Sequence, residues 1–233
     1  LASGRGMMSD QHAFMEHIAI HPDDELARLM FADFLEENGN PWGEYIRIEC
    51  ELVKPTLDAE ERKTLEKRSQ ELFSRYRQDW TSEIASLCDY VVIGFDRGIP
   101  TRLRMGWQDF ARHAKTLDFI APTINSLITW DVSPITFDPE EPGVFARLKT
   151  LEIQQGGSKA ESIARAIIET TVLSNLQSLS MTGIPFTYQQ AKELIQAHHI
   201  RTIQELTISF NRLSKSQRDK LKASFPGRIT SRD

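Results

Sequence analysis

The chain has 233 residues, of which 40% are hydrophobic and 26% are charged, and its formal net charge at pH 7 is −5. These values are typical of a globular protein with one or two hydrophobic cores, and we expect two. The negative net charge provides no basic field for a phosphate backbone, which argues against a nucleic-acid partner. Cys50 and Cys88 form neither a CxxC pair nor a disulfide framework, so the sequence favours a reducing cytoplasm and no zinc site.

The sequence contains no apolar run of about 18 residues, the length needed to cross a bilayer. Its first residues also lack the apolar stretch of a secretory signal. We therefore expect a cytoplasmic protein without a membrane segment. Residues 1–8, which begin with "LASGRGM", are interpreted as a disordered vector remnant, with the native start at Met7 or Met8.

Residues 9–88 are expected to form a helical domain. Ser9 or Asp10 can cap a first helix, and Pro22 with the acids that follow it suits the first turn of a second. Apolar residues recur at helical spacing in that second segment, at Leu26, Leu29, Met30 and Phe34. The helix should end at "ENGNP", because its glycine can adopt the left-handed conformation and its proline prevents continuation.

Residues 45–52, "YIRIECEL", fit two periodicities. Every second residue from 46 to 52 is apolar, as in a strand, whereas Tyr45, Ile48 and Leu52 share one face of a helix. We favour a helix, because the segment that follows has apolar residues at intervals of three and four.

Asp33 follows Leu29 by four residues and Met30 by three, so it is expected to point along the apolar face of the second helix. A carboxylate near a core needs donors, because burying it unpaired is costly. Asp33 could be a catalytic acid, or it could accept hydrogen bonds from Arg47, the Trp42 indole or the backbone of the turn. We favour a structural clamp of Asp33, Trp42 and Arg47, because perturbed acids also occur in ion-pair networks without catalysis.

Residues 89–233 contain an internal repeat. The segments "LKTLEI" at 148, "LQSLSM" at 176 and "IQELTI" at 203 each carry apolar residues at the first, fourth and sixth positions. A weaker copy, "INSLIT", begins at 124, and "TRLRM" at 101 can be an earlier strand. Because amphipathic helical segments lie between the copies, the pattern predicts an α/β leucine-rich-repeat solenoid with parallel strands on its concave side and helices on its convex side. The N-terminal helical domain would cap this solenoid.

The repeats depart from the full pattern at the ninth position, where an asparagine side chain would hold the turn. Only Asn211 occupies this position, while Gly156 and Ile184 stand in the other two strong copies. Residues 136–145, "TFDPEEPGVF", contain prolines and acids and are expected to loop out between repeats.

Side chains that flank the buried pair on each strand should face the concave surface, and most of them are small and uncharged. The candidate binding residues on this surface are Arg102, Arg104, Ile128, Trp130, Glu152, Gln154, Ser180, Thr182, Thr207 and Ser209. Trp130 is the strongest candidate for a binding anchor, because tryptophan is enriched at interaction hot spots. The alternative is that the acidic insertion or the N-terminal helices cover Trp130 within the monomer.

The stretch "RLMFADFLEENGNPWGEYIRIECEL" resembles the repeat-companion domain that precedes leucine-rich repeats in bacterial proteins. The matching residues are Arg28, Leu29, Ala32, Asp33, Leu35, Glu36, Glu37, Gly39, Gly43, Glu44, Glu51 and Leu52. Phe34 replaces the usual tryptophan, and the likeness continues through "LFSRYRQDW" into "GFDRGIPTRLRM". The resemblance implies an architecture, with repeats of the ribonuclease-inhibitor-like type, and no reaction.

The sequence lacks a Walker loop, GxGxxG, GxSxG, HExxH and the kinase motifs. Its six histidines are scattered, and the setting of Cys50 indicates a packed residue more than a nucleophile. We therefore expect a monomeric, non-enzymatic module, without cofactor or metal, that binds a protein partner on the concave face. One alternative is an adaptor or substrate-receptor subunit whose helical domain recruits an enzyme. A less favoured alternative is an acid-dependent hydrolase that uses Asp33.

Overall fold

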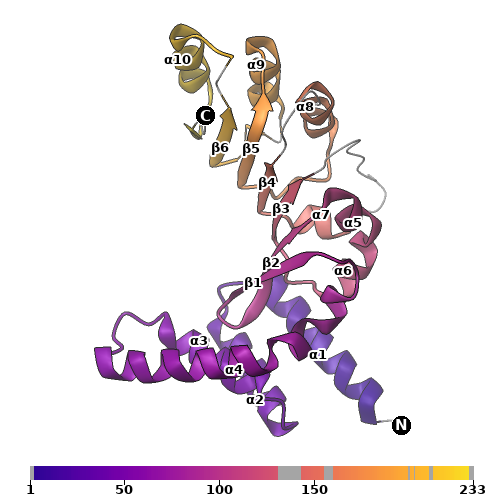
Figure 1. Cartoon of the computed structure of the whole chain (residues 1–233), viewed down its shortest axis with the longest axis vertical. Coiled ribbons are helices and arrows are strands. Elements are labelled where there is room, and N and C mark those ends of the chain that lie inside the picture. Colours follow the sequence, from indigo (N-terminus) through magenta and orange to yellow (C-terminus); the bar gives the residue numbers. More distant parts are fainter. Residues whose placement is uncertain are drawn as a thin grey trace. The chain divides into compact units, whose positions relative to one another are not determined.

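The computed structural model describes residues 3–130, 143–154, 160–198, 200–201, 203–209 and 212–230. It is an α/β structure in which N-terminal helices precede a seven-stranded, mostly parallel sheet whose strands alternate with helices (Figure 1). The helices are α1 (Ser3–Ile20), α2 (Glu25–Glu37), α3 (Trp42–Leu52), α4 (Ala59–Ala85), α5 (Trp107–Arg112), α6 (Ala114–Ile120), α7 (Gly143–Arg147), α8 (Ala160–Glu169), α9 (Tyr188–Gln196) and α10 (Lys215–Ser224). The strands are β1 (Val91–Asp96), β2 (Ile99–Met105), β3 (Ser126–Trp130), β4 (Thr150–Gln154), β5 (Ser178–Pro185), β6 (Glu205–Ser209) and β7 (Arg228–Thr230).

The chain divides into two compact units. The N-terminal unit comprises Leu1–Asp89, Ile93–Thr101 and Thr116–Ile124. The C-terminal unit comprises Tyr90–Val92, Arg102–Lys115 and Asn125–Asp233. The sequence suggested a boundary after residue 88, which lies beside the end of the first stretch of the N-terminal unit. Two later segments also belong to that unit, and one of them contains the turn between β1 and β2.

The sequence predicted the C-terminal end of α2 but not its start, because α2 begins at Glu25 and Pro22 lies outside its first turn. The Asp24 side chain accepts a hydrogen bond from the Ala27 backbone N–H at 3.0 Å, so it caps the first turn. At the other end Gly39 has φ 69°, and its N–H donates to the Glu36 carbonyl at 2.9 Å. A glycine in this left-handed conformation ends many helices, because it has no Cβ atom to clash.

The structure confirms the helix predicted at residues 45–52 but begins the first helix earlier than expected. Residues 45–52 lie within α3, so the helical interpretation of this ambiguous segment is confirmed. The first helix, however, begins at Ser3 and not near Ser9, and residues 3–8 are part of α1. These residues include no proline, so the chain can continue the helix toward its N-terminus.

The buried face of α2 differs from the face that we expected. Phe31 and Leu35 are buried, whereas Leu26 is 68% and Met30 is 51% exposed. The segment carries apolar residues around most of its circumference, so periodicity alone did not select the face that packs. Asp33 is exposed as a result of this orientation.

Side chains from the helices and from β2 form the core of the N-terminal unit. The largest members are Met15, Ile18, Phe31, Leu35, Trp42, Tyr45, Ile46, Ile48, Leu72 and Ile99. The Tyr45 ring stacks on Trp80 with a centroid separation of 5.0 Å, and burial raises the pKa of its phenol. Aromatic side chains therefore join α3 to α4.

The turn between β1 and β2 packs against α3 within the N-terminal unit. Its central residues Arg97 and Gly98 have φ 45° and φ 80°, as a two-residue hairpin turn requires. A Cβ atom on Gly98 would lie 2.6 Å from the Cα atom of Ile46, so this approach requires glycine. The Trp42 indole N–H donates to the Gly98 carbonyl at 2.8 Å and fixes the turn to the start of α3.

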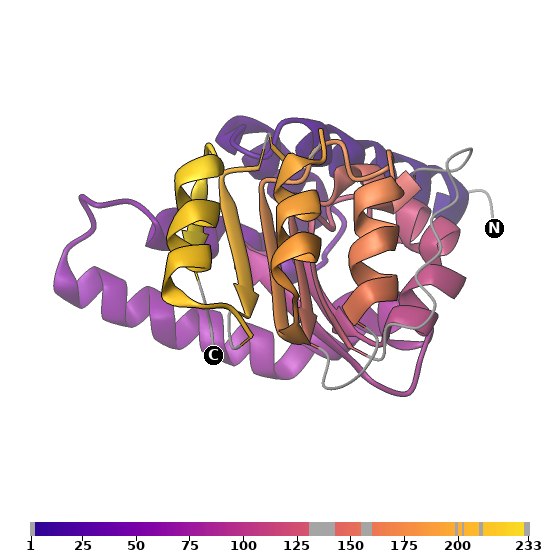
Figure 2. The same cartoon turned by 90° about the horizontal axis from the view of Figure 1, so that it is seen from above.

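In the C-terminal unit, successive strands from β2 to β7 pair in sequence order and run parallel. One buried aliphatic residue from each strand occupies an equivalent register position: Leu103, Leu127, Leu151, Leu179, Leu206 and Ile229. Helices α8, α9 and α10 lie side by side on one face of these strands (Figure 2). The burial of each such side chain contributes about 1.5–3 kcal/mol to folding.

The backbone makes the same contact between successive copies of the repeat. The N–H of Lys149 donates to the Asn125 carbonyl at 2.7 Å, and the N–H of Gln177 donates to the Lys149 carbonyl at 2.8 Å. The N–H of Gln204 donates to the Gln177 carbonyl, also at 2.8 Å. Helices α9 and α10 each begin with a reciprocal capping box. Equivalent backbone hydrogen bonds therefore recur at the spacing of the sequence repeat.

The last part of β5 lacks the asparagine of a full repeat. Gly183 has φ 71°, its N–H donates to the Ser209 hydroxyl at 3.2 Å, and Ile184 at the ninth position is buried. The other ninth-position residues, Gly156 and Asn211, lie outside the described residues.

The loop expected at 136–145 ends earlier than its sequence indicates. Residues 136–142 lie outside the described residues, but the last three residues of the expected loop belong to α7. The Phe145 ring packs against Trp107 and Phe110, with centroid separations of 5.9 Å and 5.3 Å. Burial of this aromatic side chain stabilises a helix where the prolines and acids had suggested a loop.

Replacement of Gly98 by alanine should destabilise the N-terminal unit more than the same change at Gly39. Gly39 has φ 69°, and a Cβ atom added to it would meet nothing within 4 Å. Gly39→Ala should therefore lower the free energy of unfolding by only about 1–2 kcal/mol, the cost of holding an alanine in the left-handed conformation. Gly98→Ala adds a clash with the backbone of Ile46 and should cost about 1–3 kcal/mol more. Urea denaturation followed by circular dichroism measures both; equal losses would contradict the close approach.

Candidate binding face

The candidate residues of the concave surface, except Ser209, lie in rows across neighbouring strands, together with residues of β7. The first row contains Arg102, Ser126, Thr150, Ser178, Glu205 and Arg228. The second contains Arg104, Ile128, Glu152, Ser180, Thr207 and Thr230. The third contains Trp130, Gln154 and Thr182. Because side chains two residues apart on a strand point to the same side, these rows share one face of the sheet, here called the strand face.

Exposure along the strand face is uneven. Arg102 and Arg104 are exposed, and the side chains at Ile128, Trp130 and the candidate positions of β4 and β5 are partly buried. Ser209 differs from the expectation, because it is only 2% exposed. The pairing of β5 with β6 shifts between Met181 and Pro185, so Ser209 lies opposite Pro185 and leaves the regular pattern.

An aromatic and cationic group lies at one end of the strand face. The Trp130 ring meets the Tyr90 ring edge to face, with centroids 5.6 Å apart and planes at 71°. The Arg104 guanidinium lies over the Trp130 ring, 5.9 Å from its centroid, within the range of a cation–π interaction. Ile128 lies on β3 two residues before Trp130 and points to the same side. Tyr90, Arg104, Ile128 and Trp130 are here called the Trp130 cluster.

Part of the Trp130 cluster is open to solvent. Tyr90 is 54% exposed, and Val92, two residues further along the chain, is 48% exposed. The sequence left open whether the acidic insertion covers Trp130, and residues 131–142 lie outside the described residues. The described part of the cluster therefore combines an exposed apolar surface with a guanidinium group.

The rest of the strand face is polar, and several of its side chains contact one another. The Gln154 amide donates to the Glu152 carboxylate at 2.8 Å, and the Thr207 and Thr230 hydroxyls are 2.7 Å apart. These hydrogen bonds fix side-chain positions, but this part of the strand face has few large apolar side chains. The Trp130 cluster is therefore the part of this face that best fits an energetic anchor.

The three clamp candidates do not form one network. The Arg47 guanidinium donates to the Asp33 carboxylate and, at 3.2 Å, to Glu36, which links α3 to α2. These hydrogen bonds, with that to Glu36 the strongest influence, raise the pKa of Arg47. The Trp42 indole donates instead to Gly98. Asp33 therefore contacts Arg47, one of the partners that its sequence position suggested, on the exposed side of α2.

Arg28 is a structural residue whose importance the sequence pattern did not reveal. Its side chain is only 1% exposed, and it donates to the Pro22 carbonyl at 2.8 Å and to the Asp96 carboxylate at 3.3 Å. Arg97 donates to the same Pro22 carbonyl at 2.7 Å. Burial lowers the pKa of Arg28, with the nearby positive charge of Arg97 acting in the same direction. In the sequence, only the match of Arg28 to the repeat-companion motif indicated a role for this residue, and the motif does not indicate which residues it contacts.

Cys50 is only 1% exposed, and its burial raises the pKa of its thiol, which agrees with a packed side chain. Among the described residues, no three His, Cys, Asp or Glu side chains are grouped so that they could hold a metal ion. None of the helices in the described ranges combines the length and hydrophobicity needed to cross a membrane.

Comparisons of the chain with protein-family models, with curated proteins and with solved structures find no match. The likeness to the repeat-companion domain therefore rests on the motif residues themselves.

Replacement of Arg28 by methionine should destabilise the protein more than the same replacement of Arg47. The Arg28 guanidinium is buried and makes several hydrogen bonds, so Arg28→Met should cost about 1–3 kcal/mol. Arg47 is 43% exposed and forms surface ion pairs, so Arg47→Met should cost about 0.2–1 kcal/mol. Chemical denaturation at low and high salt measures both losses, and only the Arg47 effect should fade with salt. A larger loss for Arg47→Met would refute this ranking.

Proposed function

We propose that the C-terminal unit is a short leucine-rich-repeat solenoid whose strand face binds a protein partner. The sequential parallel strands and the equivalent leucines on successive strands support the solenoid. The backbone contact that recurs at the spacing of the sequence repeat supports it further. In this proposal the N-terminal helices act as the companion domain that the motif resembles, and the protein is a monomer that catalyses no reaction.

The Trp130 cluster is the observation that carries the proposed binding role. Tryptophan, tyrosine and arginine are the residues most enriched at energetic hot spots, and one of each lies in this cluster. The cation–π contact holds the Arg104 side chain over the Trp130 ring, so less side-chain freedom remains to be lost on binding. The polar strands β4–β6 would then provide complementarity around the anchor.

A second apolar surface in the N-terminal unit favours the adaptor alternative. The exposed side chains of Leu26 and Met30 line a groove of about 550 Å³ between α1 and α2. The groove is lined by Asp10, Ala13, Phe14, His17, Asp24, Leu26, Ala27, Met30 and Phe34. An adaptor would use this groove for one protein and the strand face for another.

Trp130→Ala should reduce the capture of a strand-face partner at least about tenfold, because truncation of a hot-spot residue costs about 2 kcal/mol or more. The measurement is affinity capture from the native cell, with quantitative mass spectrometry of the retained proteins. Tyr188→Ala on α9 is the matched control, because it removes an aromatic side chain from the helix side of the same unit. If a folded Trp130→Ala variant retains the same proteins in the same amounts as the wild type, the cluster is not the anchor.

The adaptor alternative predicts that two point variants lose different proteins. Met30→Glu places a charge on the exposed groove and should release one set of partners, while Trp130→Ala releases another. Point variants are preferable to truncation after residue 88, because Ile93–Thr101 belongs to the N-terminal unit. The loss of one common set of proteins from both variants would contradict an adaptor.

A further inference from the structure

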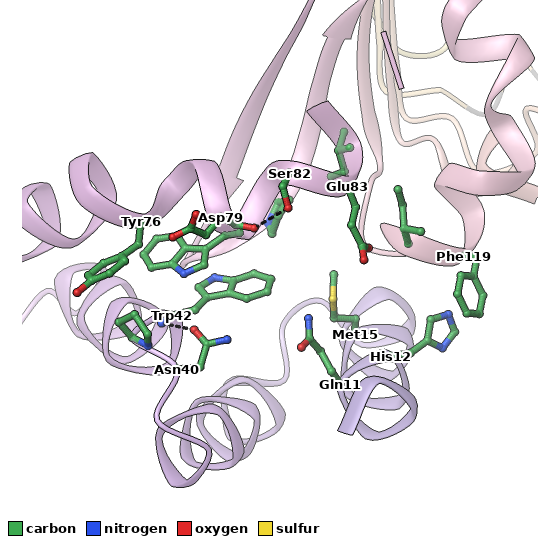
Figure 3. Close-up of a pocket in the computed structure, with 15 residues that line it drawn as sticks. Gln11, His12, Met15, Asn40, Trp42, Tyr76, Asp79, Ser82, Glu83 and Phe119 are labelled. Atoms are coloured by element: carbon green, nitrogen blue, oxygen red, sulfur yellow. Dashed lines mark hydrogen bonds between the residues drawn. The ribbon is translucent and has the colours of Figure 1, made fainter. Parts of the chain in front are cut away.

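The N-terminal unit contains a cavity of about 750 Å³ that the proposed function does not use. Its walls come from α1, from α3 and the turn before it, from α4, from β2 and from α6 (Figure 3). The lining residues that matter for its chemistry are Trp42, Trp80, Phe119, His12, Asp79 and Glu83. A volume of this size suits a small organic molecule or a single long side chain.

Aromatic rings form much of the wall. The Trp42 and Trp80 rings are nearly parallel, with centroids 6.1 Å apart and planes at 17°. On the α1 side of the cavity the His12 ring stacks on Phe119 with a centroid separation of 4.5 Å. Phe119 is 64% exposed. Trp42 is only 4% exposed, so the ring surfaces that the cavity offers to a ligand are those of Trp80 and Phe119.

Two carboxylates supply the charge of the cavity. Asp79 and Glu83 lie four residues apart on α4, so they share one face of that helix. Among the described residues, no hydrogen bond or ion pair engages either carboxylate, whereas Glu44 on the same unit is held by two hydrogen bonds from Arg68, at 2.7 Å and 2.8 Å. In Figure 3 the Glu83 side chain points from α4 toward the part of the cavity that α1 lines.

The lining of the cavity contains no lysine or arginine among the described residues. The guanidinium of Arg75, which is not part of the lining, lies 5.2 Å from the centroid of the Tyr76 ring. One face of Tyr76 is therefore already occupied by a cation, and the ring surfaces available to a ligand are those of Trp80 and Phe119. The cavity combines these rings with an excess of negative charge.

We propose that this cavity binds a compact organic cation, an alkylammonium or guanidinium group. Such a cation gains from two features of the cavity, because ring faces attract positive charge and the carboxylates complete the charge balance. The group could belong to a free amine or to a basic side chain of a peptide, and the chemistry of recognition is the same. The inference is independent of the strand face and stands if that proposal fails.

The first test compares a cation with an uncharged molecule of the same shape. Choline and 3,3-dimethyl-1-butanol are titrated separately into the full chain, and the indole N–H signals of Trp42 and Trp80 are followed by ¹H–¹⁵N NMR. Choline should shift these signals with an affinity at least about tenfold higher than that of the alcohol. Equal affinities, or no shift of either signal by choline or by the peptide of the second arm, would overturn the proposal.

The second arm separates the two sources of the cation. A short peptide with one central arginine is compared with the same peptide carrying citrulline, which has the same shape without the charge. Tighter binding of choline than of the arginine peptide identifies a free amine as the ligand class, and the reverse order identifies a basic side chain. Either order supports a cation site, whereas a citrulline peptide that binds as well as the arginine peptide argues against one.

Glu83→Gln tests the role of the carboxylate and should weaken the binding of choline about three- to tenfold. Glu66→Gln is the matched control, because Glu66 is an exposed residue of the same helix that does not line the cavity. This control removes the same charge and should leave the affinity nearly unchanged. Equal losses in the two variants would show that net charge, and not the cavity, attracts the cation. Both side chains are exposed, so the variants should fold.

Discussion

The N-terminal unit depends on the close approach of the β1–β2 turn to α3. Gly98 permits this approach because a side chain there would overlap the backbone at Ile46. The Trp42 indole then satisfies the Gly98 carbonyl, which would otherwise be a buried acceptor without a donor. Arg28 joins the same region by donating to Asp96 and Pro22. The absence of a side chain at Gly98 therefore allows polar contacts between the β1–β2 turn and helices that are far from it in the sequence.

Buried and exposed charges contribute differently to this unit. The Arg28 guanidinium is almost fully buried, and its hydrogen bonds to Pro22 and Asp96 replace part of the water that it has lost, while its Nε has no partner among the described residues. The guanidinium groups of Arg47 and Arg68 are about half exposed, so solvent and salt weaken their ion pairs with the acids of α2 and α3. The hydrophobic core and the buried hydrogen bonds therefore provide most of the stability, while the surface pairs orient neighbouring helices.

The two candidate binding regions differ in chemistry. The Trp130 cluster presents aromatic rings together with an arginine, on a sheet face whose other side chains are mostly small and polar. The cavity of the N-terminal unit presents aromatic rings together with carboxylates and no lining lysine or arginine among the described residues. The first composition is typical of a protein interface, and the second is suited to a cation. The two regions are thus expected to select different ligands.

Local and periodic signals in the sequence predicted the end of α2 at Gly39 and the buried leucines of the repeat. These features depend on residues that are close in sequence or equivalent between copies, so their pattern is visible without the fold. Only the tertiary structure decided that Asp33 faces solvent, that Arg28 is buried and that Ser209 leaves the strand face. The same holds for the cavity around Trp42 and Trp80, whose lining comes from five separate elements. A sequence pattern can show that a helix has an apolar face, but which segment covers that face depends on distances between residues that are remote in the chain.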